Sequence, residues 1–172
     1  MVVVDVLAGL GFALLLIWLH EYGHLWRGRV LGVPRHAIQV RLDVSPPHVA
    51  LHDGRGWLSP ADAGYAETFT RHCPGLARAY GFVAGGAGVE SAVSFLTITL
   101  LVGVGTQPVA LVLAAATLIL FFAYVVLDVA LSAWRRAPYG DFAVLWTLSP
   151  ASTLAWVLAL AILKTGTLLW LM

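Results

Sequence analysis

The sequence predicts an all-α membrane protein, a four-helix transmembrane bundle with a small β-hairpin in the loop between the first and second helices. Two observations predict this fold. The 172 residues are 60% hydrophobic and only 11% charged, whereas a soluble domain usually carries about 25% charged residues. Four apolar stretches also reach the length of about 20 residues with which a helix crosses the hydrocarbon core. We expect a single integral membrane domain over residues 1–172, with lipid as its solvent.

The four expected helices cover about residues 2–26, 79–104, 109–133 and 142–171. A tight turn at residues 103–108 joins the second helix to the third. A net charge of +1 argues against a nucleic-acid partner, because nucleic acid is bound by a strongly basic face. The single cysteine, Cys73, excludes an internal disulfide.

The loop at residues 27–78 is the one long segment that is not apolar, and its five prolines exclude a continuous helix. Residues 36–42 and 48–52 alternate roughly between polar and apolar side chains, as half-buried strands do. Ser45-Pro46-Pro47 would form the turn between them. We therefore expect a hairpin at the membrane surface.

Basic residues predict the orientation in the membrane. Of the ten Lys and Arg residues, seven lie in the loop at residues 27–78, and Arg135 and Arg136 lie between the third and fourth helices. With four spans these two connections share one side, which the positive-inside rule assigns to the cytoplasm. Lys164 falls near the opposite end of the last span, where its stem can snorkel to the surface.

The segment His20-Glu21-Tyr22-Gly23-His24 carries the clearest chemical signal. Histidines four apart on a helix project from one face, one turn apart, so both imidazoles can bind one Zn²⁺. Glu21 lies next to the first histidine and can accept a proton from a water molecule at the metal. Three ionisable groups are costly at this depth unless they act together. The alternative is a membrane helix that simply ends in interfacial polar residues.

A hydrolytic zinc site needs a third protein ligand, and two aspartates qualify. Asp141 follows a Pro138-Tyr139-Gly140 turn that opens the fourth apolar region, and we favour it because broken backbone is typical of membrane sites. Its alternative role is a helix cap. Asp128 lies near the cytoplasmic end of the third helix, and its alternative role is to orient a ligand histidine.

Glu90 is a further candidate, because a carboxyl group in the middle of a span is rarely without a role. It could contact the substrate backbone, tune the site or form a hydrogen bond to a neighbouring helix. Around it the second helix carries a stripe of small residues, which favours close packing of backbones. The stripe consists of Gly81, Gly85 and Gly88, with Ala84 and Ala92 adjacent to it.

Other histidines are less convincing as ligands. His48 and His52 have the same spacing as His20 and His24, but on a strand they lie about 13 Å apart, too far to share an ion. His36, His72 and Cys73 are scattered through the loop and are adequately explained as interfacial residues.

Taken together, the His20-Glu21-Tyr22-Gly23-His24 segment and an aspartate opening a later span resemble the site-2 protease family of intramembrane zinc metalloproteases. The resemblance covers about residues 8–150. It implies that His20, His24 and Asp141 are zinc ligands, with Glu21 as catalytic base. The family often shows Asn-Pro or Leu-Asp-Gly at the third ligand, whereas this chain has Gly140-Asp141-Phe142, closer to a divergent bacterial branch.

The resemblance implies zinc-dependent hydrolysis of a peptide bond in or next to a membrane-spanning protein substrate. It also implies a bacterial inner membrane, with the active site towards the cytoplasm. Two alternatives have different consequences. A non-catalytic membrane scaffold would not need Glu21 beside two ligands. A small metal or ion carrier would need a polar path through several helices, and residues 109–122 offer almost no polar side chain.

Overall fold

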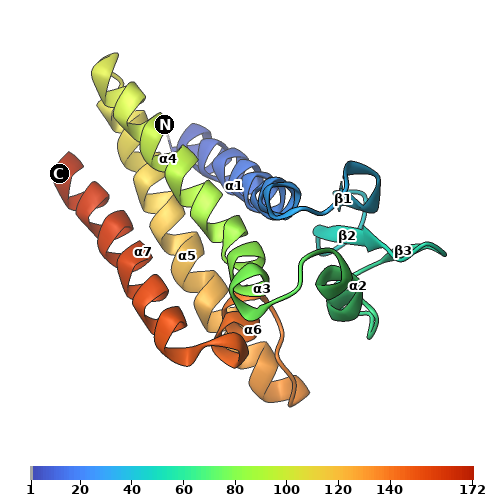
Figure 1. Cartoon of the computed structure of the whole chain (residues 1–172). Helices are drawn as coiled ribbons and strands as arrows, with labels where there is room; N and C mark the ends of the chain where they lie inside the picture. Colours follow the sequence, from blue (N-terminus) through green and yellow to red (C-terminus); the bar gives the residue numbers. More distant parts are fainter. Residues whose placement is uncertain (1) are drawn as a thin grey trace. The chain divides into compact units, whose positions relative to one another are not determined.

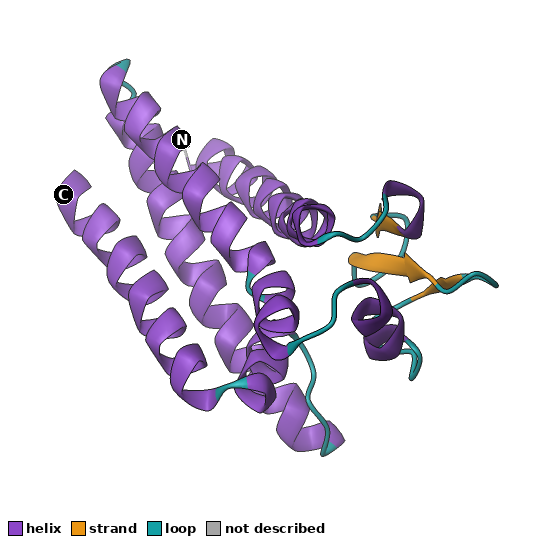
Figure 2. Cartoon of the chain, in the orientation of Figure 1, coloured by secondary structure: helices purple, strands orange, loops and turns teal. Residues whose placement is uncertain are grey.

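The computed structural model describes residues 2–172, which are mostly helical with one small antiparallel sheet (Figure 2). This confirms the predicted helical class and the β-element after the first helix. The backbone forms two compact units. The loop unit is Ile17–Val89, and the helical unit combines the chain up to Leu16 with Glu90–Met172.

The first helix, α1, runs over Val2–Leu31 and is longer than the expected 2–26. It ends where Gly32 adopts a positive φ of 113° and the amide of Val33 donates to the carbonyl of Gly28 at 3.0 Å. This is the Schellman arrangement, in which a left-handed glycine satisfies the last free carbonyls of a helix. Side chains of residues 1–9 lie outside the described part, so the first membrane span stays a prediction.

The loop unit contains a three-stranded sheet in the order β1-β2-β3, formed by Ile38–Arg41, His48–His52 and Trp57–Leu58. β1 pairs antiparallel with β2 from Ile38 opposite Leu51 to Arg41 opposite His48, which confirms the predicted hairpin. Arg35–Ala37 forms a short 3₁₀ helix where the first strand was expected to begin. β3 was not predicted, because two residues carry no readable alternation.

Charged side chains secure the two turns of this sheet. Arg41 donates two hydrogen bonds of 2.8 Å to Asp43, and this lowers the pKa of Asp43 to about 2. Between β2 and β3, Asp53 accepts hydrogen bonds from the amides of Arg55 and Gly56, each at 2.8 Å. These two backbone donors lower the pKa of the Asp53 carboxyl.

Two short helices complete the loop unit: α2, Tyr65–His72, and α3, Leu76–Val83. α2 lies against β2 (Figure 1), and the hydroxyl of Tyr65 donates to the carbonyl of Val49 at 2.9 Å. The core joins the end of α1, the sheet and both helices, and contains Leu25, Val33, Ala37, Ile38, Val49, Leu51, Phe69, Cys73 and Phe82. Burial raises the pKa of the Cys73 thiol, which donates to the carbonyl of Leu31.

Four helices follow: α4, Gly85–Gly103, α5, Gln107–Arg135, α6, Asp141–Leu148, and α7, Pro150–Leu171. α4 and α5 are joined by the predicted tight turn. α5 packs along α7, and α6 packs against both (Figure 1).

The fourth expected helix is broken because Ser149 precedes Pro150 and is extended, at φ −161° and ψ 96°. The second is broken at Ala84, between α3 and α4.

Among the described residues, three helices are long and apolar enough to cross a membrane: α4, α5 and α7. Their outer faces carry large exposed apolar side chains, among them Leu100, Ile119, Val126, Ile162 and Leu169. Lipid is a favourable environment for such faces and water is not. The structure thus supports a membrane protein. Of the four predicted transmembrane helices, it supports three.

Candidate functional site

The two histidines of the His20-Glu21-Tyr22-Gly23-His24 segment lie on one face of α1 within the loop unit. His20 and His24 are 8% and 7% exposed, and their ring centroids are 4.9 Å apart. The Nε2 atom of His24 lies 3.1 Å from the Nε2 atom of His20. Helical spacing brings the two rings together, as predicted, and each ring turns the same nitrogen towards the other.

This separation suits a shared ion. Two nitrogens that each bind one tetrahedral zinc at about 2.0–2.1 Å lie about 3.3 Å apart. The observed 3.1 Å between the Nε2 atoms is close to that value. A neutral pair of imidazoles can also share one N–H···N hydrogen bond at this distance. The distance between the Nε2 atoms therefore fits a pair of histidines that binds one metal ion. It also fits a metal-free pair joined by a hydrogen bond.

The other ring nitrogen of His24 is fixed by the backbone. Its Nδ1 atom lies 3.0 Å from the carbonyl oxygen of Phe82, the penultimate residue of α3. A carbonyl only accepts, so Nδ1 carries the proton and Nε2 presents a lone pair. Metal-binding histidines commonly have such an outer partner, which fixes both the tautomer and the ring orientation. Sequence analysis did not identify Phe82, because any residue type supplies a carbonyl.

Glycines make room for the two rings. A Cβ atom built on Gly86, in the first turn of α4, would collide with the Nε2 atoms of both His20 and His24. The nitrogens therefore lie over bare backbone. A Cβ on Gly23 would come within 2.6 Å of the carbonyl of Gly85, so α1 and α4 approach closely here. Gly23 therefore permits close contact between two helix backbones.

Glu21 occupies the position next to His20 on α1 and is half-buried. Adjacent residues on a helix point about 100° apart, so Glu21 projects from a neighbouring face. A carboxylate next to a ligand histidine is near enough to serve as a proton acceptor for a water molecule at the metal.

The two candidate aspartates both belong to the helical unit. Asp141 is the first residue of α6 and is half-buried, after Gly140 at φ 83°. Asp128 is buried on α5, and its Oδ2 atom accepts a hydrogen bond of 2.9 Å from the amide of Phe142. A Cβ at position 140 would overlap the Asp128 carboxylate, so Gly140 is required there. Asp128 therefore caps α6 and orients the turn that carries Asp141.

Glu90 lies on α4 and is buried at 8% exposure. Its Oε1 atom accepts a hydrogen bond of 3.0 Å from Nζ of Lys164 on α7. The expectation that Lys164 snorkels to the surface is wrong, because its side chain is 4% exposed and paired. Helix side chains lean towards the helix N-terminus. A lysine near the C-terminal end of α7 therefore points back into the helical unit, away from the nearer end.

The remaining histidines lie in the loop unit, away from the His20–His24 pair in sequence and in secondary structure. His48 and His52 stand at the two ends of β2, as the strand prediction requires. The Nδ1 atom of His48 lies 3.1 Å from the carbonyl of Pro46, and Nδ1 of His52 accepts from the amide of Gly54. His36 belongs to the 3₁₀ turn, and His72 ends α2.

Comparison of the chain with protein-family models, with curated proteins and with solved structures finds no match. The function is therefore inferred from the chemistry of the chain's own residues.

Proposed function

We propose that the chain is a zinc-dependent protease that hydrolyses a peptide bond in or next to a membrane-spanning protein. The observation that carries this proposal is the arrangement of His20 and His24, whose Nε2 atoms lie 3.1 Å apart while Nδ1 of His24 binds the carbonyl of Phe82. Two buried imidazoles whose Nε2 atoms can bind the same ion would form half of a tetrahedral zinc site. The presence of Glu21 beside them favours hydrolysis over a purely structural ion.

The residues fit a zinc ion by donor type and by the spacing of the two Nε2 atoms. A zinc ion bound there would polarise a carbonyl group and lower the pKa of a nearby water molecule. His20 and His24 would hold the ion, and the carbonyl of Phe82 fixes the orientation of the His24 ring. Glu21 accepts the proton of the attacking water and passes it to the leaving amine.

Asp141 is our proposed third ligand. It opens α6 directly after the Gly140 turn, and two nitrogens with one carboxylate oxygen are a familiar catalytic donor set for zinc. Asp128 is engaged by the amide of Phe142, which suits a supporting role better than coordination. The same donor set would also accept other divalent ions, so the identity of the metal needs direct measurement.

The substrate class follows from the apolar surroundings. Helices α4, α5 and α7 have lipid-compatible surfaces, so a substrate segment would arrive from within the membrane. A helical substrate must unwind before its carbonyls can react, and an unwound segment can pair with the edge of a sheet. β1 is an edge strand of the loop unit and offers such a template. In the proposed orientation the site faces the cytoplasm of a bacterial cell.

Metal analysis tests the site. We expect the full chain, purified in detergent, to carry about one zinc ion, and His24→Ala or Asp141→Ala to lose it. His52→Ala is the matched control, since this histidine lies on β2 and should leave the zinc content unchanged. Equal metal content in the wild type and in His24→Ala would refute the site.

Cleavage of a membrane-spanning reporter in proteoliposomes tests the activity. Glu21→Gln removes the proton acceptor while preserving size, so we expect a rate loss of at least about 100-fold with zinc retained. A biological function that survives Glu21→Gln unchanged would instead support a non-catalytic membrane scaffold.

A further inference from the structure

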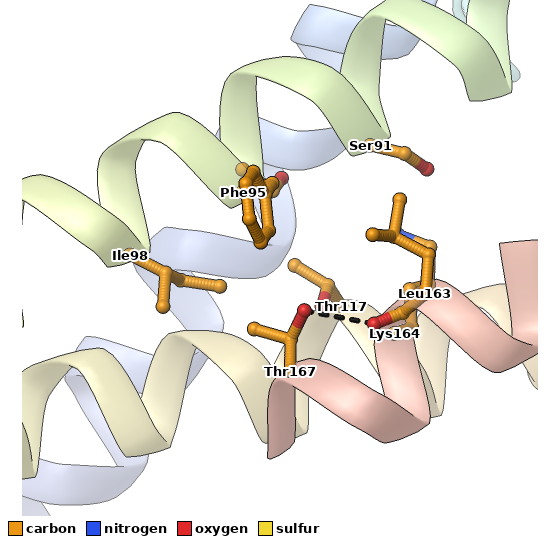
Figure 3. A pocket seen from close by; sticks show the side chains of 8 residues that line it. Ser91, Phe95, Ile98, Thr117, Leu163, Lys164 and Thr167 are labelled. Atoms are coloured by element: carbon orange, nitrogen blue, oxygen red, sulfur yellow. Dashed lines mark hydrogen bonds between the residues drawn. The ribbon is translucent and has the colours of Figure 1, made fainter. Parts of the chain in front are cut away.

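A second polar site lies inside the helical unit, beside the ion pair of Glu90 and Lys164. Figure 3 shows the side chains that line it, Lys164 among them. Side chains from α4, α5 and α7 converge on a small cavity there. Its polar lining is Ser91, Ser94, Thr117, Lys164 and Thr167. Phe95, Ile98 and Leu163 close the remainder of its wall. This cluster is separate from the histidine pair and takes no part in the proposed hydrolysis.

One polar atom in this cluster has no partner. Ser91 is only 4% exposed, and its Oγ atom makes no hydrogen bond among the described residues. An unsatisfied buried hydroxyl costs about 1–3 kcal/mol, and most buried polar groups therefore have a protein or water partner. In Figure 3 the Ser91 side chain extends from α4 towards the gap between α4 and α7. An occupant of the cavity could supply the missing partner.

The other polar groups in the lining also have unused hydrogen-bonding capacity. An ammonium group has three donors, of which Lys164 gives one to Glu90. Thr117 and Thr167 donate to carbonyls of their own helices, those of Ala114 and Leu163, so each hydroxyl oxygen can still accept. The lining therefore offers both hydrogen-bond donors and hydrogen-bond acceptors to an occupant of the cavity.

The size of the cavity restricts what can occupy it. About 10 Å³ is open to the centre of a water molecule. A single water needs about 10–15 Å³ by the same measure, together with two to four polar partners. A lipid carbonyl or a peptide segment would need much more room. A lone ion would upset an ion pair that is already electrically balanced.

We propose that this cavity binds one structural water molecule that bridges Ser91 on α4 and Lys164 on α7. The water accepts a hydrogen bond from the ammonium group and satisfies the serine hydroxyl. It thereby extends the Glu90–Lys164 ion pair into a hydrated network inside the helical unit. Such a network links helices α4 and α7 by polar contacts that a lipid environment cannot replace.

A structure of the full chain in a lipid phase, at a resolution that reveals ordered waters, tests this proposal. We expect one isolated density peak within hydrogen-bonding distance of both Ser91 Oγ and Lys164 Nζ. An empty cavity, or density that extends beyond a single atom, would overturn the proposal.

A solution measurement gives an independent test. In nanodiscs, we expect a long-lived water cross-peak at the amides of residues 91–94, and Ser91→Val should abolish it because the added methyl groups fill the cavity. Thr97→Val on the same helix is the control, since the exposed Thr97 hydroxyl bonds the carbonyl of Val93. A cross-peak of equal strength in Ser91→Val and in Thr97→Val would contradict the assignment.

Discussion

At the scale of single residues, the proposed metal site depends on one position without a side chain. Gly86 contributes no ligand, yet any side chain at this position would overlap the Nε2 atoms of both histidines. The carbonyl of Phe82 has a comparable indirect role, because it decides which nitrogen of His24 carries the proton. Both residues act on the site through the imidazoles and not through the metal.

Gly86→Ala should therefore weaken zinc binding. The new methyl group collides with the rings of His20 and His24 and displaces them, and we expect an affinity loss of about 10–100-fold, as for other residues that support a ligand. Competition with a chromophoric chelator measures this affinity. Gly103→Ala, at the end of the same helix, meets nothing within 4 Å and serves as the control. Equal zinc affinity in both variants would show that the space over position 86 is unimportant.

Asp53 predicts a pH dependence in the turn between β2 and β3. Its pKa lies below the ordinary value of 3.8 because the amides of Arg55 and Gly56 bind the carboxylate. A lowered folded-state pKa means that the stabilising effect is complete above the unfolded pKa and is lost as the pH falls through the folded value. Amide chemical shifts of Arg55 and Gly56 should therefore titrate with a midpoint below 3.8. In Asp53→Asn this titration should disappear.

At the scale of secondary-structure elements, the start of α6 is fixed from outside the helix. The buried carboxylate of Asp128 on α5 accepts from the amide of Phe142, one of the N-terminal amides that a helix cannot satisfy itself. Negative charge at a helix N-terminus is also favourable. One side chain on α5 thus sets where α6 begins and how its first residue, Asp141, is presented.

Asp128→Ala should destabilise the chain by about 1.5–3 kcal/mol, the range for a buried hydrogen bond to a charged group. Thermal unfolding in detergent measures the loss, and faster hydrogen exchange at the Phe142 amide localises it. Asp128→Asn retains an acceptor oxygen and should lose less. If Asp128→Ala and Asp128→Asn were equally stable to unfolding, the capping role would be contradicted.

At the scale of the whole molecule, two kinds of interaction hold the fold. The loop unit has an apolar core, with Phe69 and Phe82 stacked at 4.4 Å between centroids. The helical unit adds a buried ion pair, Glu90–Lys164, between segments that are 74 residues apart in sequence. In a lipid environment, apolar contacts between helices contribute little to helix association, because lipid is equally apolar. Polar contacts between helices therefore matter more.

Removing one partner of this ion pair should therefore lower the unfolding free energy substantially. Glu90→Leu leaves the Lys164 ammonium buried without its counter-ion, and we expect a loss of about 3–5 kcal/mol in unfolding free energy. The double variant Glu90→Leu, Lys164→Met should recover most of that loss, because no uncompensated charge remains. Unfolding in mixed micelles distinguishes the cases. Equal destabilisation by the single and double variants would mean that the charges do not interact.

The sequence by itself determined the elements whose signals are local. Apolar stretches predicted the long helices, alternation predicted the β1–β2 hairpin, and a four-residue spacing on a helix placed His20 and His24 on one face. These follow from periodicity, which depends only on neighbouring residues. The break at Ser149 could also have been anticipated, because Pro150 disfavours helix at the residue before it.

Tertiary structure alone decided which distant groups meet. The carbonyl of Phe82 at His24, the bare backbone of Gly86, the cap that Asp128 provides and the pairing of Lys164 with Glu90 all join segments far apart in the chain. Periodicity carries no information on such partners, since a lysine near a helix end can extend to the surface or turn inward. An unpaired charge in an apolar interior has a high free-energy cost, and this cost decides which buried groups pair. Its size depends on the surrounding fold.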